Sequence, residues 1–213
     1  MLIKKDYKVL FHGDSITDAG RDRDDLYSLA PDSHPFLSAE RFNAEHPELN
    51  VSFYNRAVSG FRTCDLLSVL ERDLEEVKPD LVCLHIGIND VWRRYDSNIY
   101  TSAEEYEQNF TAILKTIDKF GAKCVVLGLF ALPAPDKVHW RDEVNEKIKI
   151  SAKLAKKHAN AYINTDEVFE TLLELGAPWN RFSNDGVHPT FQGAQILSDC
   201  FIKAINQKEG LFR

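Results

Sequence analysis

Five short apolar runs, separated by longer segments with helical spacing, constrain the fold more than any other feature of the chain. Short and nearly continuous apolar runs favour parallel strands that are buried on both faces. The runs lie at 9–12, 51–54, 81–86, 124–129 and 161–163, and the segments with helical periodicity lie at 35–45, 63–77, 102–120, 138–158, 166–175 and 191–205. This alternation predicts an α/β fold, a three-layer α/β/α sandwich around a five-stranded parallel sheet in the flavodoxin-like order 2-1-3-4-5.

Length and charge limit what a chain of this kind can bind. The 213 residues are predicted to form a single domain, 1–213. The formal net charge of −7 argues against a nucleic-acid partner and against an anionic membrane surface. No segment approaches the roughly 20 apolar residues of a membrane-spanning helix. The N-terminus does not resemble a secretory signal, and the four cysteines show no disulfide or metal-binding pattern, so a cytoplasmic location is expected.

Polar residues gather directly after the predicted strands. Ligands of such folds bind beyond the carboxyl ends of the strands, so these segments are the first candidates for a site. In chain order they are Gly13-Asp14-Ser15, "NRAVSG" at 55–60, "GIND" at 87–90 and, before the last helix, "NDGVHP" at 184–189.

These segments contain the parts of an acyl-transfer site. Ser15 would be the nucleophile, His188 the base and Asp185 the carboxylate that orients the histidine, since an Asp-x-x-His turn lets the two side chains meet. The oxyanion hole would combine the backbone N–H groups of Ser15 and Gly60 with the side-chain amide of Asn89. No metal or organic cofactor is expected.

Simpler interpretations exist for several of these residues. Asp14-Ser15 alone could be a helix cap, and Asp14 is expected to bind nearby backbone amides rather than to take part in catalysis. The aspartates of the segment "DAGRDRDD", 18–25, are expected to be solvated carboxylates on a surface loop rather than metal ligands.

The four segments together resemble the SGNH (GDSL) hydrolase family. "GDSIT", "NRAVSG", "GIND" and "DGVHP" match its four sequence blocks in order, although Ala57 stands where the family often has glycine. The resemblance implies a serine esterase with Ser15, Asp185 and His188 as catalytic residues. Two further alternatives, a phosphoacceptor receiver domain and an inactive binding module, fit the complete residue set less well.

A longer stretch, "GINDVWRRYD" at 87–96, is similar to the family's intracellular carbohydrate acetylesterases, in particular those that deacetylate xylo-oligosaccharides. This similarity implies hydrolysis of acetyl esters on a carbohydrate, with Trp92 either stacking on a sugar ring or packing in the protein. The alternative is a lysophospholipase or thioesterase with the same catalytic residues and a longer acyl pocket. Candidate walls for such a pocket are Phe130, Leu132, Trp140 and Trp179. Relatives that act on oligosaccharides often assemble, so a homo-oligomer is compatible with the resemblance.

Overall fold

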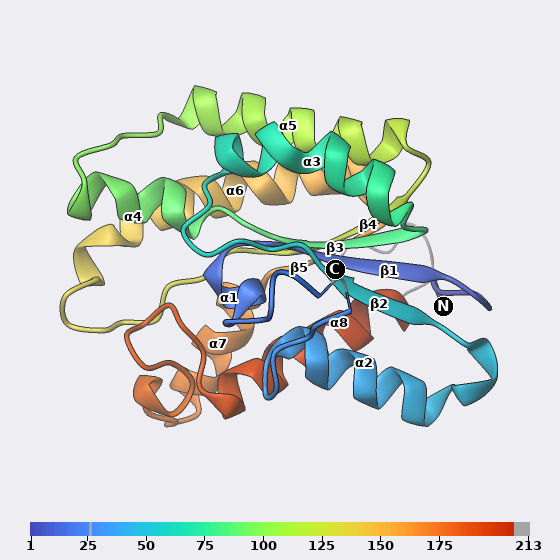
Figure 1. Cartoon of the computed structure of the whole chain (residues 1–213). Coiled ribbons are helices and arrows are strands. Elements are labelled where there is room, and N and C mark those ends of the chain that lie inside the picture. Colours follow the sequence, from blue (N-terminus) through green and yellow to red (C-terminus); the bar gives the residue numbers. More distant parts are fainter. Residues whose placement is uncertain (26, 207–213) are drawn as a thin grey trace.

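A parallel sheet forms the middle layer of the protein (Figure 1). The computed structural model describes residues 1–25 and 27–206. Five strands pair in the order β2-β1-β3-β4-β5, and every pairing is parallel. The strands are β1 (Lys8–Gly13), β2 (Ser52–Asn55), β3 (Leu81–His85), β4 (Lys123–Leu127) and β5 (Ala161–Ile163). The predicted fold class and strand order are therefore confirmed.

Helices cover both faces of this sheet. In Figure 1, α3 (Thr63–Val77), α5 (Ala103–Lys119) and α6 (Arg141–His158) lie above it, whereas α2 (His34–Glu45), α7 (Thr165–Glu174) and α8 (Phe191–Asn206) lie below. Apolar residues are buried on both faces of the sheet. Leu70 of α3 and Phe110 of α5 are buried on one side, and Phe42 of α2 and Phe201 of α8 on the other. None of the helices in the described part of the chain combines the length and the hydropathy of a membrane-spanning segment.

The predicted helices are present, with shifts at their ends. The segment 138–158 is a 3₁₀ turn, Val138–Trp140, followed by α6. Two short helices, α1 (Ser15–Asp18) and α4 (Ile88–Asp96), directly follow β1 and β3 and were not among the predicted helical segments, although Asp14-Ser15 was considered as a helix cap. Both are dominated by polar or charged residues, so their sequences carry little apolar periodicity.

The β1–α1 junction lies tightly against β3. Gly13 is the last residue of β1, and a Cβ atom placed on it would lie 2.0 Å from the backbone oxygen of His85. Only a residue without a side chain allows this approach. Gly13 therefore sets the position at which the chain turns from the sheet into Ser15.

We expect Gly13→Ala to destabilise the protein by more than about 3 kcal/mol, because the new methyl group must displace the backbone of a central strand. Gly121→Ala is the matched control. Gly121 has φ +77° but open space around its Cα, so that alanine should cost only about 1–2 kcal/mol of backbone strain. Urea unfolding of both variants measures the difference, and equal losses of stability would contradict the close approach.

Candidate active site

Ser15 begins helix α1, and its neighbour Asp14 caps that helix. The Asp14 side chain accepts a hydrogen bond from the backbone N–H of Ile16 at 3.0 Å. Such a cap satisfies one of the free donors of the first helical turn. The expectation that Asp14 binds a nearby backbone amide is confirmed, and the cap fixes the turn that carries Ser15 at the end of the sheet.

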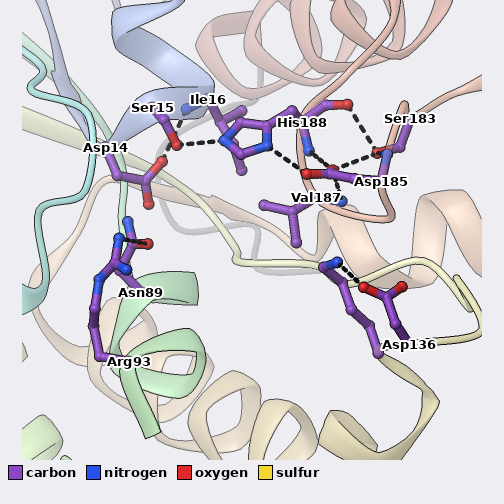
Figure 2. Close-up of polar contacts among 11 residues, drawn as sticks. Asp14, Ser15, Ile16, Asn89, Arg93, Asp136, Ser183, Asp185, Val187 and His188 are labelled. Carbon is purple, nitrogen blue, oxygen red and sulfur yellow. Dashed lines mark hydrogen bonds and ion pairs between the residues drawn. The ribbon is translucent and has the colours of Figure 1, made fainter. Parts of the chain in front are cut away.

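Ser15, His188 and Asp185 form one hydrogen-bonded chain (Figure 2). The Oγ of Ser15 lies 2.9 Å from Nε2 of His188, and Nδ1 of His188 lies 2.7 Å from Oδ2 of Asp185. An ionised carboxylate only accepts hydrogen bonds, so Nδ1 carries the proton of a neutral imidazole. Nε2 is then free to accept the proton of the Ser15 hydroxyl.

The loop before α8 fixes the Asp185–His188 pair. The second carboxylate oxygen of Asp185 accepts hydrogen bonds from the backbone N–H groups of Val187, at 2.9 Å, and His188, at 2.7 Å. The Gly186 carbonyl accepts a bond from the N–H of Leu132, which links this loop to the segment after β4. Backbone hydrogen bonds thus hold both the Asp185 carboxylate and the loop that carries the His188 imidazole.

These contacts shift the ionisation of both groups. The hydrogen bond to Asp185 raises the pKa of His188, against an opposing effect of burial. Burial alone would raise the pKa of Asp185, but the hydrogen bonds that it accepts from His188 and Val187 hold that pKa below its usual range. The pair therefore favours an ionised carboxylate beside a histidine that readily takes up a proton.

Gly60 and Asn89, the other predicted oxyanion donors, are linked through Phe61 and Arg93. The side-chain amide of Asn89 donates to the Phe61 carbonyl at 3.0 Å, and its oxygen accepts from Arg93 at 3.4 Å. Gly60 has φ +87°, and an added Cβ would lie 3.5 Å from the same guanidinium. An amide nitrogen carries two hydrogens, so the bond to Phe61 leaves Asn89 one N–H to donate.

Comparison with known proteins identifies the family of the chain. The sequence pattern of the GDSL-like Lipase/Acylhydrolase family matches residues 11–196. The chain belongs to this family. It is accordingly a carboxylic ester hydrolase.

Relatives of this GDSL-like acylhydrolase match it over nearly the whole length. An acetylxylan esterase of Geobacillus stearothermophilus is 29% identical over 217 residues, which cover 96% of each chain. The solved structure of LAE5, an alpha/beta hydrolase enzyme from the metagenome of Lake Arreo, has a TM-score of 0.88 at 25% identity and covers 96% of this chain and 97% of its own.

Solved structures of the Geobacillus stearothermophilus enzyme include catalytic mutants that replace a serine, an aspartate or a histidine. The histidine mutant has a TM-score of 0.89 at 26% identity, covering 98% of each chain.

Asp18 stabilises the segment 55–60, which is the second of the four sequence blocks. Its position differs from the prediction. Asp18 was expected on a solvated surface loop, but it is 1% exposed. Its carboxylate accepts hydrogen bonds from the backbone N–H of Ser59 at 2.8 Å and the Ser59 hydroxyl at 2.6 Å, and it pairs with Arg23. Asp18 therefore fixes the residue before Gly60.

In the described part of the chain, no cluster of histidine, cysteine or acidic side chains could hold a metal ion.

Trp92 lies beside His188. Its half-buried ring is 5.6 Å from the His188 ring and 5.3 Å from the Trp140 ring, measured between centroids. The ammonium of Lys137 lies 5.0 Å from the Trp92 ring and 5.2 Å from the Trp140 ring. Sequence analysis did not identify Lys137, because nothing in its local sequence indicates that the side chain is buried against two tryptophans.

Three of the four candidate walls of a long acyl pocket are buried in the protein. Phe130 is fully buried, and its ring packs against Phe169 and His85. Leu132 and Trp140 are also buried, whereas Trp179 is half-buried in a separate 3₁₀ turn. Phe130 is thus not available to a ligand.

Asp14 should make the stability of the protein depend on pH. Burial raises its pKa to about 7, from an ordinary value of 3.8. A group whose pKa rises on folding stabilises the fold fully below its unfolded pKa, and this contribution is lost as the pH rises through the folded pKa. We expect the free energy of unfolding to fall between about pH 4 and pH 7, and Asp14→Asn to remove this component because asparagine keeps the acceptor oxygen but does not ionise.

Urea unfolding of both proteins at pH 5 and pH 8 measures this difference. Asp14→Ala serves as the control, because it also does not ionise and should be less stable than Asp14→Asn by about 1 kcal/mol at either pH, through loss of the cap. An identical pH dependence in the wild type and the asparagine variant would contradict the assignment.

Proposed function

We propose that the protein is a serine esterase that hydrolyses short-chain acyl esters, above all acetyl esters, on a carbohydrate such as acetylated xylo-oligosaccharides. The observation that carries this proposal is the hydrogen-bonded chain from Ser15 through His188 to Asp185. Similarity to an acetylxylan esterase over 96% of the chain supports the choice of substrate.

The reaction begins with attack of the Ser15 Oγ on the ester carbonyl carbon. His188 accepts the hydroxyl proton at Nε2, and Asp185 stabilises the imidazolium that results. The carbonyl oxygen becomes an oxyanion, which accepts hydrogen bonds from the N–H groups of Ser15 and Gly60 and from the Asn89 amide.

Collapse of this intermediate breaks the bond to the alcohol. His188 donates its proton to the leaving oxygen, and the acyl group remains on Ser15. Water then attacks the acyl-enzyme with His188 as base, which releases the acid and restores the serine hydroxyl. The proposed mechanism uses no metal or organic cofactor.

The relatives support these roles. Catalytic mutants of the Geobacillus stearothermophilus enzyme replace a serine, an aspartate and a histidine, and the aspartate precedes the histidine by the same three positions as Asp185 precedes His188. Trp92 is proposed to contact substrate, since its ring lies beside His188.

Three expectations from the sequence stay predictions: a single domain over 1–213, a cytoplasmic location and a homo-oligomer.

Acetate release from acetylated xylo-oligosaccharides tests the proposed function. The wild type should release acetate, and Ser15→Ala should lower the rate by a factor of about 10⁴ or more because no acyl-enzyme forms. On p-nitrophenyl esters, the activity should decrease as the acyl chain lengthens. Ser15-dependent activity that prefers long acyl chains and leaves acetylated sugars intact would favour the lysophospholipase or thioesterase alternative.

The pH dependence of kcat/KM tests the role of Asp185. Neutral His188 is the base, so kcat/KM should rise with pH through a His188 pKa that lies above the usual range. In Asp185→Asn the acidic limb should move to lower pH, because the carboxylate that favours the imidazolium is lost. The maximal rate should fall roughly 10⁴-fold, as in other Ser-His-Asp enzymes. An acidic limb that does not move would show that Asp185 does not control this ionisation.

A further inference from the structure

A cavity of about 270 Å³ opens on one side of the Ser15–His188 pair. Its walls come from α1, from the turn before α2, and from the loop before α8 together with the first residues of that helix. The lining includes Ser15, Asp32, His188 and Phe191.

The chemistry of ester cleavage decides which part of the substrate this cavity can hold. In the tetrahedral intermediate the oxyanion points to its N–H donors, whereas the leaving oxygen must lie within reach of the proton on His188. The cavity contains both Ser15 and His188, but neither Gly60 nor Asn89 lines it. It therefore lies on the leaving-group side of the nucleophile.

We propose that the alcohol part of the ester occupies this cavity, and that Asp32 and Phe191 determine which alcohols are accepted. This inference rests on the proposed esterase function and specifies where the alcohol part of the substrate binds. Both residues lie outside the four family blocks, and sequence analysis did not identify either of them.

Asp32 gives the cavity a polar and negatively charged wall. The residue is exposed and has φ +63°, and within the described residues its carboxylate has no hydrogen-bond or ion-pair partner. A free carboxylate accepts hydrogen bonds from hydroxyl groups and repels phosphates. This wall favours a neutral polyol and disfavours phosphate-bearing leaving groups, such as those of lysophospholipids or nucleotide thioesters.

Phe191 gives the cavity an apolar wall. It is the first residue of α8, and its side chain is 44% exposed. Among the described residues, its ring contacts no other aromatic ring. An exposed aromatic face suits the C–H groups of a sugar ring, whose hydroxyl groups can at the same time reach a carboxylate.

If the alcohol occupies this cavity, Trp92 does not contact it. Trp92 follows Asn89 by three residues on α4, so the two side chains lie on neighbouring positions of one helix face. It does not line the cavity. Trp92 then lies on the oxyanion side of His188, where it would contact the acyl group.

Two variants test the proposal by changing the cavity without changing the catalytic residues. Phe191→Ala removes the aromatic wall, and Asp32→Asn removes the charge while keeping a residue type that tolerates the left-handed backbone. Leu175→Ala and Asp118→Asn are matched controls, since both residues are exposed and neither lines the cavity.

The assay compares kcat/KM on two acetyl esters, an acetylated xylo-oligosaccharide and ethyl acetate, whose small alcohol leaves the outer cavity empty. We expect Phe191→Ala to lower kcat/KM on the sugar ester roughly tenfold and Asp32→Asn roughly threefold to tenfold. Both variants should leave kcat/KM on ethyl acetate within about twofold, and the controls should change neither substrate.

Equal losses on both esters, or no loss on either, would overturn the assignment of the alcohol to this cavity. So would a loss on the sugar ester that occurs in Trp92→Leu but not in the cavity variants. Failure of the proposed function is distinguishable, because it would appear in the wild type, as an absence of Ser15-dependent hydrolysis of any ester.

Discussion

The hydrogen bond between Asp185 and His188 is the interaction on which the site depends. At 2.7 Å it fixes the proton on Nδ1, and thereby makes Nε2 the acceptor that faces Ser15. The same carboxylate accepts two backbone N–H bonds of its own loop, so the orientation of the imidazole is coupled to the loop conformation. A short Asp-x-x-His segment thus contains both the proposed base and the carboxylate that orients it.

The sheet brings the remaining groups to this pair. Ser15 follows β1, and Asn89 follows β3, the strand that pairs directly with β1. The glycine that ends β1 permits the sharp turn into Ser15, and Asp14 caps the helix that this turn begins. On the other side of the nucleophile, a cavity reaches the Pro31–Ser33 turn and Phe191. Ser15, the proposed nucleophile, therefore lies between the proposed oxyanion donors and the cavity proposed for the alcohol.

The sequence was sufficient to predict the elements with periodic apolar residues and the contacts between residues of one short motif. Buried strands and amphipathic helices have periodic apolar residues, and Asp185 and His188 interact within one turn. Asp18 was placed wrongly because its burial depends on Ser59, 41 residues away, and the surrounding segment is strongly polar. Lys137 and the cavity residues Asp32 and Phe191 could not be predicted, since each acquires its position only when distant segments pack together.

Labelling with an active-site-directed phosphonate, followed by peptide mass spectrometry, tests the central claim most directly. It reports whether Ser15 is an activated nucleophile, independently of the natural ester. The account predicts one phosphonyl group per chain, on the peptide containing Ser15, and a large decrease in the labelling rate in His188→Ala. Labelling at another serine, or equal labelling rates in the wild type and His188→Ala, would contradict it.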